Sequence, residues 1–181
     1  LGPNGAGKST LIKVLMGLVR VSSGSGTVLG NRLGKQGRLI RSKIGYMPED
    51  DCYLPGLKGV EAVQFSACLA GIPSTEALRR AHEILDFCGM KQERYREIET
   101  YSTGMRARLG FATALMNRSD VILIDEVLSV GDQAFKLKAT AALKDQMTED
   151  RGVVIVSHAE QQIKNLCDTA IWLDEARVVA S

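Results

Sequence analysis

The sequence has no long apolar run, no paired cysteines and no large excess of charge, and each absence excludes a class of protein. No apolar run approaches the roughly 18 residues of a membrane-spanning helix. The four cysteines are scattered without a C-x-x-C pair, which fits reduced thiols in a cytosolic protein better than a disulfide framework or a zinc site. The net charge is only +2 with acids and bases intermixed, so nothing indicates a nucleic-acid-binding surface.

The chain also lacks an initiating methionine and a signal peptide. It begins at Leu1 inside a glycine-rich loop that a buried strand should precede, and it reaches Ser181 without an obvious stop. We therefore interpret it as an internal fragment of a longer protein whose N-terminal strands are missing. Its 181 residues suffice for one domain with a real core and a subdomain.

The first ten residues carry the most informative motif. They read LGPNGAGKST and match G-x-x-x-x-G-K-[ST], a phosphate-binding loop whose glycines let backbone N–H groups converge on phosphate oxygens. A helix predicted over residues 9–19 would point its positive end at the same phosphates. We expect Lys8 to reach the β- and γ-phosphates and the Ser9 hydroxyl to ligate Mg²⁺, although a turn that binds nothing is the alternative. The expected ATP-binding residues are Asn4, Gly5, Ala6, Gly7, Lys8, Ser9 and Thr10.

The rest of the pattern predicts an α/β domain with a mostly parallel sheet and an inserted block of helices. Continuous aliphatic runs fit strands that are covered on both faces. Strands are expected at 27–29, 43–47, 121–124, 153–156, 170–173 and 178–180. Helices are expected at 9–19, 60–69, 77–87 (with Ser74 as N-cap), 104–116, 132–147 and 161–166, and a polar loop at 30–37. Residues 1–53 and 119–181 would form the nucleotide-binding core, and 54–118 a helical subdomain.

Polar residues follow two of the buried strands, at the edge where parallel sheets bind ligands. Asp125 and Glu126 end one strand, and His158 follows another. We expect Asp125 to hold Mg²⁺ opposite Ser9, and Glu126 to polarise the attacking water. Acids at a strand end can also simply meet solvent, and it is the phosphate loop that favours the catalytic interpretation.

These motifs together resemble the nucleotide-binding domains of ABC transporters, over the whole chain. The phosphate loop matches Walker A, and 121–126 matches Walker B with its catalytic glutamate. YSTGM at 101–105 stands where the signature L-S-G-G-Q does, SVGD at 129–132 stands at the D-loop, and His158 at the switch histidine. One glycine-rich loop could be accidental, but five motifs in register are not.

The resemblance implies an ATP-hydrolysing subunit of an exporter, with Mg²⁺ as cofactor and Glu126 and His158 as catalytic residues. Two such domains, identical or paired, would face each other head to tail around two ATP molecules, and Asp132 would couple the two sites. The signature residues that would contact the opposite ATP are Ser102, Thr103, Gly104 and Met105. An integral membrane permease would dock on the helical subdomain and hold the protein at the cytoplasmic face of the membrane.

Three departures from the family pattern are informative. Glu49 replaces the Q-loop glutamine, and the signature lacks its second glycine–glutamine pair. With residues 46–49 these features look like type-two ABC exporters, whereas 125–132 looks like exporters of polysaccharides and teichoic-acid-like polymers. We expect Glu49 to offer Mg²⁺ an anionic oxygen; the alternative is that it turns outward with the acids at 50–51 toward the membrane partner. The aromatic residue that stacks on adenine in this family is also missing.

Two other kinds of ABC protein are alternatives. A chromosome-maintenance or DNA-repair ATPase would place long coiled coils between the phosphate loop and the signature, whereas about one hundred residues without sustained heptads lie here. A translation-factor ABC protein would carry two such domains joined by a charged linker. The Q-loop and D-loop argue against it, and it stays the alternative because only flanking sequence could exclude it.

Overall fold

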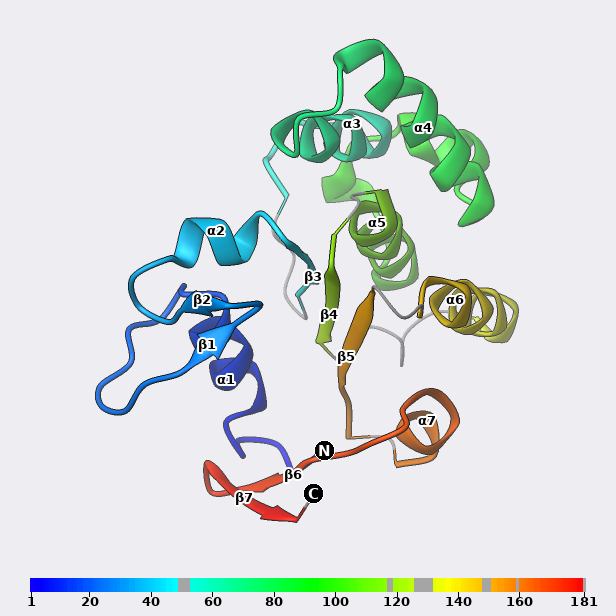
Figure 1. Cartoon of the computed structure of the whole chain (residues 1–181). Helices are drawn as coiled ribbons and strands as arrows, with labels where there is room; N and C mark the ends of the chain where they lie inside the picture. Colours follow the sequence, from blue (N-terminus) through cyan, green and yellow to red (C-terminus); the bar gives the residue numbers. More distant parts are fainter. Residues whose placement is uncertain (49–52, 117–118, 126–131, 148–150, 159, 181) are drawn as a thin grey trace.

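A three-stranded parallel sheet lies at the centre of the computed structural model, which describes residues 1–48, 53–116, 119–125, 132–147, 151–158 and 160–180 (Figure 1). Its strands, in spatial order, are β3 (Ile44–Met47), β4 (Val121–Asp125) and β5 (Gly152–Val156). Met47 pairs with Ile124, which pairs with Ile155. Because all three strands run the same way, their carboxyl ends meet at one edge, as the aliphatic runs predicted.

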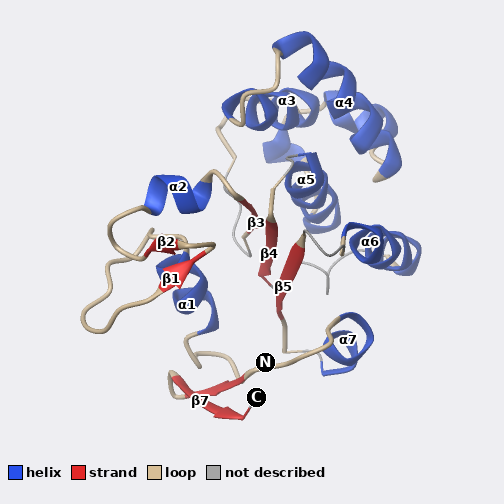
Figure 2. Ribbon diagram, in the orientation of Figure 1, coloured by secondary structure: helices blue, strands red, loops and turns tan. Residues whose placement is uncertain are grey.

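Helices cover both faces of this sheet (Figure 2). On one face α1 (Lys8–Leu15) packs through Ile12 and Met16 against Leu123. Side chains alternate along a strand, so Ile122 and Ile124 belong to the larger core on the other face. That face is covered by α5 (Thr103–Met116), α6 (Gln133–Gln146) and α7 (Glu160–Leu166). The sheet therefore separates α1 from α5.

The helical block between β3 and β4 packs as its own layer above the sheet in Figure 1. It consists of α3 (Gly59–Leu69), α4 (Ser74–Phe87), the 3₁₀ turns η1 (Lys91–Tyr95) and η2 (Ile98–Thr100), and α5. Small side chains such as Ala67, Ala77 and Ala81 are fully buried where α3, α4 and α5 meet. Within the described ranges, no helix is both long and apolar enough to span a membrane.

Two antiparallel hairpins flank the sheet. β1 (Thr27–Val28) pairs with β2 (Asn31–Arg32), and β6 (Trp172–Asp174) pairs with β7 (Arg177–Ala180). The expected loop at 30–37 was therefore wrong, because it contains β2 and ends where α2 (Gly37–Arg41) begins. Short polar strands such as β2 carry no aliphatic run that would mark them in a sequence.

Two expected helix boundaries were also wrong. The first helix ends at Leu15 rather than residue 19, because Gly17 adopts a left-handed φ of 69°. The N–H groups of Gly17 and Leu18 then return to helix carbonyls at 2.9 and 2.8 Å and close the last turn. Ser74 is not the N-cap of α4 but its first residue; the cap position is Pro73, with φ −55° and ψ 140°.

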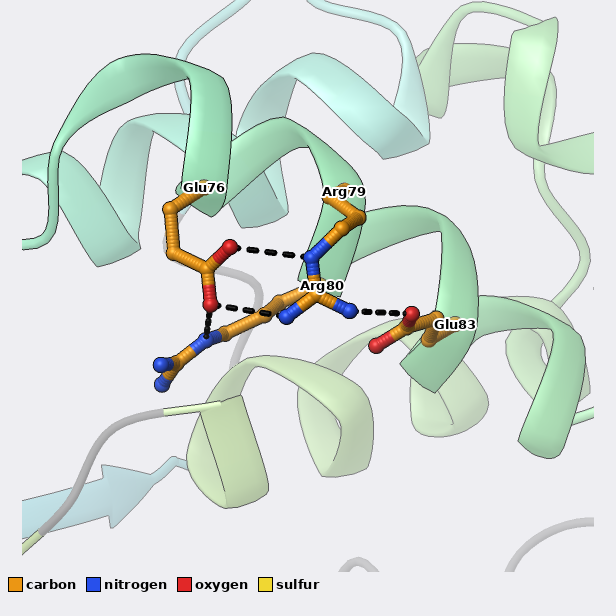
Figure 3. A network of polar contacts seen from close by, with 4 residues as sticks. All are labelled: Glu76, Arg79, Arg80 and Glu83. Carbon is orange, nitrogen blue, oxygen red and sulfur yellow. Dashed lines mark hydrogen bonds and ion pairs between the residues drawn. The ribbon is translucent and has the colours of Figure 1, made fainter.

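The exposed side of α4 carries a small ion-pair network (Figure 3). Glu76 accepts hydrogen bonds from Arg79 at 2.7 and 2.9 Å and from Arg80 at 2.6 Å, and Glu83 accepts one from Arg79. Spacings of three and four residues place all four side chains on the same helix face. The hydrogen bond from Arg79 is the main cause that lowers the pKa of Glu76 to about 2. Solvent screens these pairs, so they shape the surface more than they stabilise the fold.

Candidate nucleotide-binding site

The phosphate loop leads directly into α1. Gly5 and Gly7 adopt left-handed φ values of 84° and 89°, which only glycine tolerates easily. Gly7 is the N-cap of α1 and has no side chain, so the first N–H groups of the helix are not capped by the residue before them. Such a helix end offers backbone donors and a positive dipole to an anion.

The β6–β7 hairpin, distant in sequence, holds the phosphate loop through two backbone hydrogen bonds. The Leu173 amide donates to the Leu1 carbonyl at 2.8 Å, and the Ala176 amide donates to the Ala6 carbonyl at 3.1 Å. The approach is so close that a Cβ on Gly2 would lie 2.1 Å from the Leu173 carbonyl oxygen. Gly2 is therefore required for packing against β6, a role that no local sequence signal reveals.

Lys8 lies along the inside of the loop. Its side chain is buried, and Nζ donates to the carbonyls of Gly2 and Pro3, both at 2.9 Å. These two hydrogen bonds hold the ammonium group against the loop. Phosphate oxygens are stronger acceptors for an ammonium group than neutral carbonyls, so they can replace these contacts.

The structure brings Ser9 and Asp125 together from positions 116 residues apart, with Ser9 Oγ donating to Asp125 Oδ1 at 3.2 Å. Asp125 ends β4 and is only 1% exposed, so its carboxylate is held rigidly at the sheet edge. A hydroxyl and a carboxylate are the hard oxygen ligands that Mg²⁺ takes, with phosphate and water completing its shell. In the described part of the chain, no three His, Cys, Asp or Glu residues gather as a metal site. The Ser9 hydroxyl and the Asp125 carboxylate have the oxygen chemistry that would suit a magnesium ion.

The other predicted catalytic residues follow the same sheet edge. Asp125 is level with Val156, the last residue of β5, and His158 lies exposed two residues further on. Glu126 comes directly after Asp125, and Glu49 comes two residues after the end of β3, but both lie outside the described residues, as do 129–131 of the D-loop.

The signature residues lie at the start of α5, on the opposite face of the sheet from α1. Ser102 is exposed, and its Oγ accepts a hydrogen bond from the Met105 amide at 3.3 Å, which makes Ser102 the N-cap of α5. Thr103 is exposed, and Gly104 and Met105 are half-buried. The structure therefore does not bring the signature to the nucleotide loop on α1 of its own chain.

Asp132 connects the D-loop to the signature helix. One carboxylate oxygen caps α6 by accepting from the Phe135 amide at 2.8 Å, and the other pairs with Arg108 of α5. These contacts, the Phe135 amide first, lower the pKa of Asp132. Arg108 also donates to the Cys88 carbonyl and lies 4.7 Å from the centroid of the Phe135 ring. Arg108 was missed from the sequence, where it is one of many basic residues on a helix.

Several known proteins are similar to this chain in sequence. A family model described as ABC transporter matches residues 1–129. The chain is 33% identical over 180 residues to the linearmycin resistance ATP-binding protein LnrL of Bacillus subtilis, across 99% of the chain and 58% of that protein. It is 31% identical to the O-antigen export ATP-binding protein RfbB of Klebsiella pneumoniae (98% and 68%) and to the teichoic acids export ATP-binding protein TagH of Bacillus anthracis (98% and 30%). The chain spans about half the length of several curated relatives that it matches.

Solved structures share the fold. An ATP-binding subunit of an ABC transporter superposes with a TM-score of 0.90 and 25% identity, covering 99% of this chain and 75% of that one. A dimeric ATP-binding cassette with bound ADP and Pi superposes with a TM-score of 0.88 and 22% identity, covering 99% and 81%. These likenesses confirm the predicted α/β fold, and the relatives confirm the resemblance to exporter ATPases. The chain therefore belongs to the ABC transporter family, as one of its ATP-binding domains.

Proposed function

We propose that this chain is the ATP-hydrolysing part of an ABC exporter, working as a head-to-tail dimer with a separate membrane permease. The observation that carries the proposal is the contact between Ser9 and Asp125 at 3.2 Å, beside a helix N-terminus that no side chain caps. The motifs for phosphate and for metal thus converge at one point. Names of relatives that export teichoic acids and O-antigen support export as the direction.

In this proposal the loop binds the nucleotide before anything else happens. Amide groups from Asn4 to Thr10 and the Lys8 ammonium hold the phosphates, while Ser9 and Asp125 hold Mg²⁺. Bound there, Mg²⁺ would neutralise phosphate charge during the reaction. Glu49 is proposed as a further oxygen ligand from the end of β3.

Hydrolysis needs a base that polarises the attacking water, and we look for it among the residues that follow the strands of the sheet. We assign that role to Glu126, which follows the buried Asp125, and assign to His158 a hydrogen bond to the γ-phosphate and the water. Both side chains follow strands whose ends are level, since Asp125 pairs with Val156.

A second chain would complete the site. The sheet separates α1 from α5, so the signature at Ser102, Thr103 and Gly104 is aimed at a nucleotide other than its own. Two chains facing each other head to tail would satisfy both signatures at once, whether identical or paired. A related fold has been solved as a dimer with ADP and Pi, which supports this arrangement.

The membrane partner would occupy a groove of about 640 Å³ between the core and the helical subdomain. The lining includes Arg41, Ser42, Ile44, Ser66, residues 69–73, Glu76, Arg80 and Ser119. Leu69 is 74% exposed at this groove, and two arginines line it. Arg80 is already paired with Glu76 in this lining, so the groove offers mainly apolar surface with Arg41 beside it. Such a surface suits an amphipathic permease segment, which would place the protein on the cytoplasmic face of a membrane.

Glu126→Gln tests the proposal. A neutral amide cannot polarise water, so the full chain should bind ATP normally, lose turnover by orders of magnitude and accumulate as an ATP-bound dimer. Phosphate release and light scattering after size exclusion measure both effects. Near-normal phosphate release, or a species that stays monomeric with ATP, contradicts the role of Glu126.

A further inference from the structure

The segment that leads into the signature is joined to the segment that leads into α3. Lys58 and Glu97 form an antiparallel bridge. The Ile98 amide donates to the Leu57 carbonyl at 3.1 Å. Farther along, Glu99 Oε1 accepts from the Gly56 amide at 2.6 Å. These bonds join residues 56–58, at the start of α3, to residues 97–99, just ahead of the signature.

Tyr101 lies at the centre of this junction. It is 5% exposed and its hydroxyl donates to the Glu93 carbonyl at 2.6 Å. Burial raises the pKa of its phenol, so it keeps the proton it donates at neutral pH. A Cβ on Gly59, the first residue of α3, would lie 2.2 Å from the Tyr101 hydroxyl oxygen. The hydroxyl thus fills the space that any other residue at position 59 would need.

Two hydrogen bonds between side chains and backbone connect Tyr101 and its neighbour Ser102 to the start of α5. The Tyr101 carbonyl accepts from Arg106 Nε at 3.2 Å, so α5 reaches back over its own start. Ser102, the next residue, caps α5. The position of Ser102 and of the amides at the start of α5 therefore follows from where Tyr101 is seated on α3.

We propose that Tyr101 is a positioning residue, whose hydroxyl, seated on Gly59 and bonded to Glu93, sets how far the signature projects toward the opposite nucleotide. The inference rests on the proposed dimer. Tyr101 contacts no substrate and acts through Ser102 and the start of α5. Loss of its hydroxyl should weaken ATP-driven dimer closure and leave nucleotide binding by a single chain intact.

The test compares Tyr101→Phe with Tyr95→Phe in the full chain carrying Glu126→Gln. Tyr95 is close in sequence but 47% exposed, so it controls for the chemical change. We expect Tyr101→Phe to raise the ATP concentration for half-maximal dimerisation by up to about fivefold, the limit reached if the whole value of one buried hydrogen bond is lost from the dimer alone. The affinity for ADP, which measures the phosphate loop alone, should change less than twofold, and Tyr95→Phe should change neither.

A second pair of variants tests the close contact between Gly59 and the Tyr101 hydroxyl. Gly59→Ala alone should raise the ATP requirement about tenfold, whereas in the Tyr101→Phe background it should add less than threefold, because the hydroxyl it would strike is gone. Additive effects, unchanged dimerisation in Tyr101→Phe, or a parallel loss of ADP affinity would overturn the positioning role alone. Failure of the Glu126→Gln background itself to dimerise with ATP would overturn the proposed dimer as well.

Discussion

The two helix N-termini assigned to the nucleotide are built differently. At α1 the capping position is Gly7, so no side chain of that residue caps the first backbone N–H groups of the helix. The β6–β7 hairpin holds the loop through two backbone hydrogen bonds. At α5 the Ser102 hydroxyl already accepts the Met105 amide. The α1 end presents backbone donors that no side chain caps, whereas the proposed phosphate contact at α5 involves a hydroxyl that accepts one amide and can still donate its own proton. A single chain therefore offers phosphate an uncapped backbone at α1 and a capping side chain at α5, so different substitutions should impair the two ends.

Removing the charge at the α1 end should have the largest effect. Lys8→Met leaves phosphate oxygens without their buried cation, and we expect ATP affinity to fall on the order of 100-fold. Isothermal titration calorimetry measures it. Lys13→Met, on the exposed side of the same helix, is the matched control and should bind ATP as the wild type does. Equal affinities for the two variants would remove Lys8 from the site.

The metal contact of the α1 end comes next. Asp125→Asn keeps an oxygen for Ser9 but removes the anion, so we expect the Mg²⁺ concentration for half-maximal ATPase activity to rise about tenfold or more. Glu49→Gln should raise it less, because a glutamine still offers an oxygen. A Mg²⁺ requirement unchanged in Glu49→Gln would leave only the outward-facing orientation of that residue.

At the α5 end, capping and phosphate contact can be separated. Ser102→Ala removes the cap and should lower the free energy of unfolding by about 1 kcal/mol. Ser102→Asp keeps a good cap but places an anion against phosphate, so stability should be preserved while ATP-dependent dimerisation is lost. Chemical denaturation measures the free energy of unfolding of each variant, and size exclusion with ATP measures its dimerisation. Normal dimerisation of Ser102→Asp would mean that this helix end never meets a phosphate.

The smallest effect is expected at Asp132. Its pKa is lowered in the folded protein, so its carboxylate stabilises the fold above the unfolded pKa, and this contribution disappears as the pH falls through the folded value. Asp132→Asn should therefore lower Tm at pH 7 and lower it less at acidic pH, as the wild-type carboxylate takes up its proton. Asp145→Asn, at the exposed C-terminal end of α6, is the control and should not lower Tm at either pH.

Local patterns were sufficient to predict much of this molecule. The aliphatic runs at 121–124 and 153–156 predicted parallel strands, and both strands form; β4 is buried along most of its length, whereas Val154 of β5 is 45% exposed. The loop pattern and Asp125 predicted a site whose parts the structure brings together. The first helix was predicted too long because apolar spacing continues to residue 19, and Gly17 ends the helix regardless.

Contacts between distant segments could not be predicted in this way. Gly2 is needed because the Leu173 carbonyl approaches it, and Arg108 matters because Asp132 and Cys88 converge on it. Neither partner lies near in sequence, so no spacing rule reveals the pair. The same holds for Gly59 beneath Tyr101.

The central claim is that each nucleotide is held by the α1 end of one chain and the α5 end of another. Mixing two full-length variants tests it, both carrying Glu126→Gln: Lys8→Met, with a defective loop and an intact signature, and Gly104→Asp, with the reverse defects. Each alone should stay monomeric with ATP in light scattering. Mixed, they can assemble one complete site, and the account predicts an ATP-dependent dimer only in the mixture. No dimer in the mixture, or a dimer from either variant alone, would contradict it.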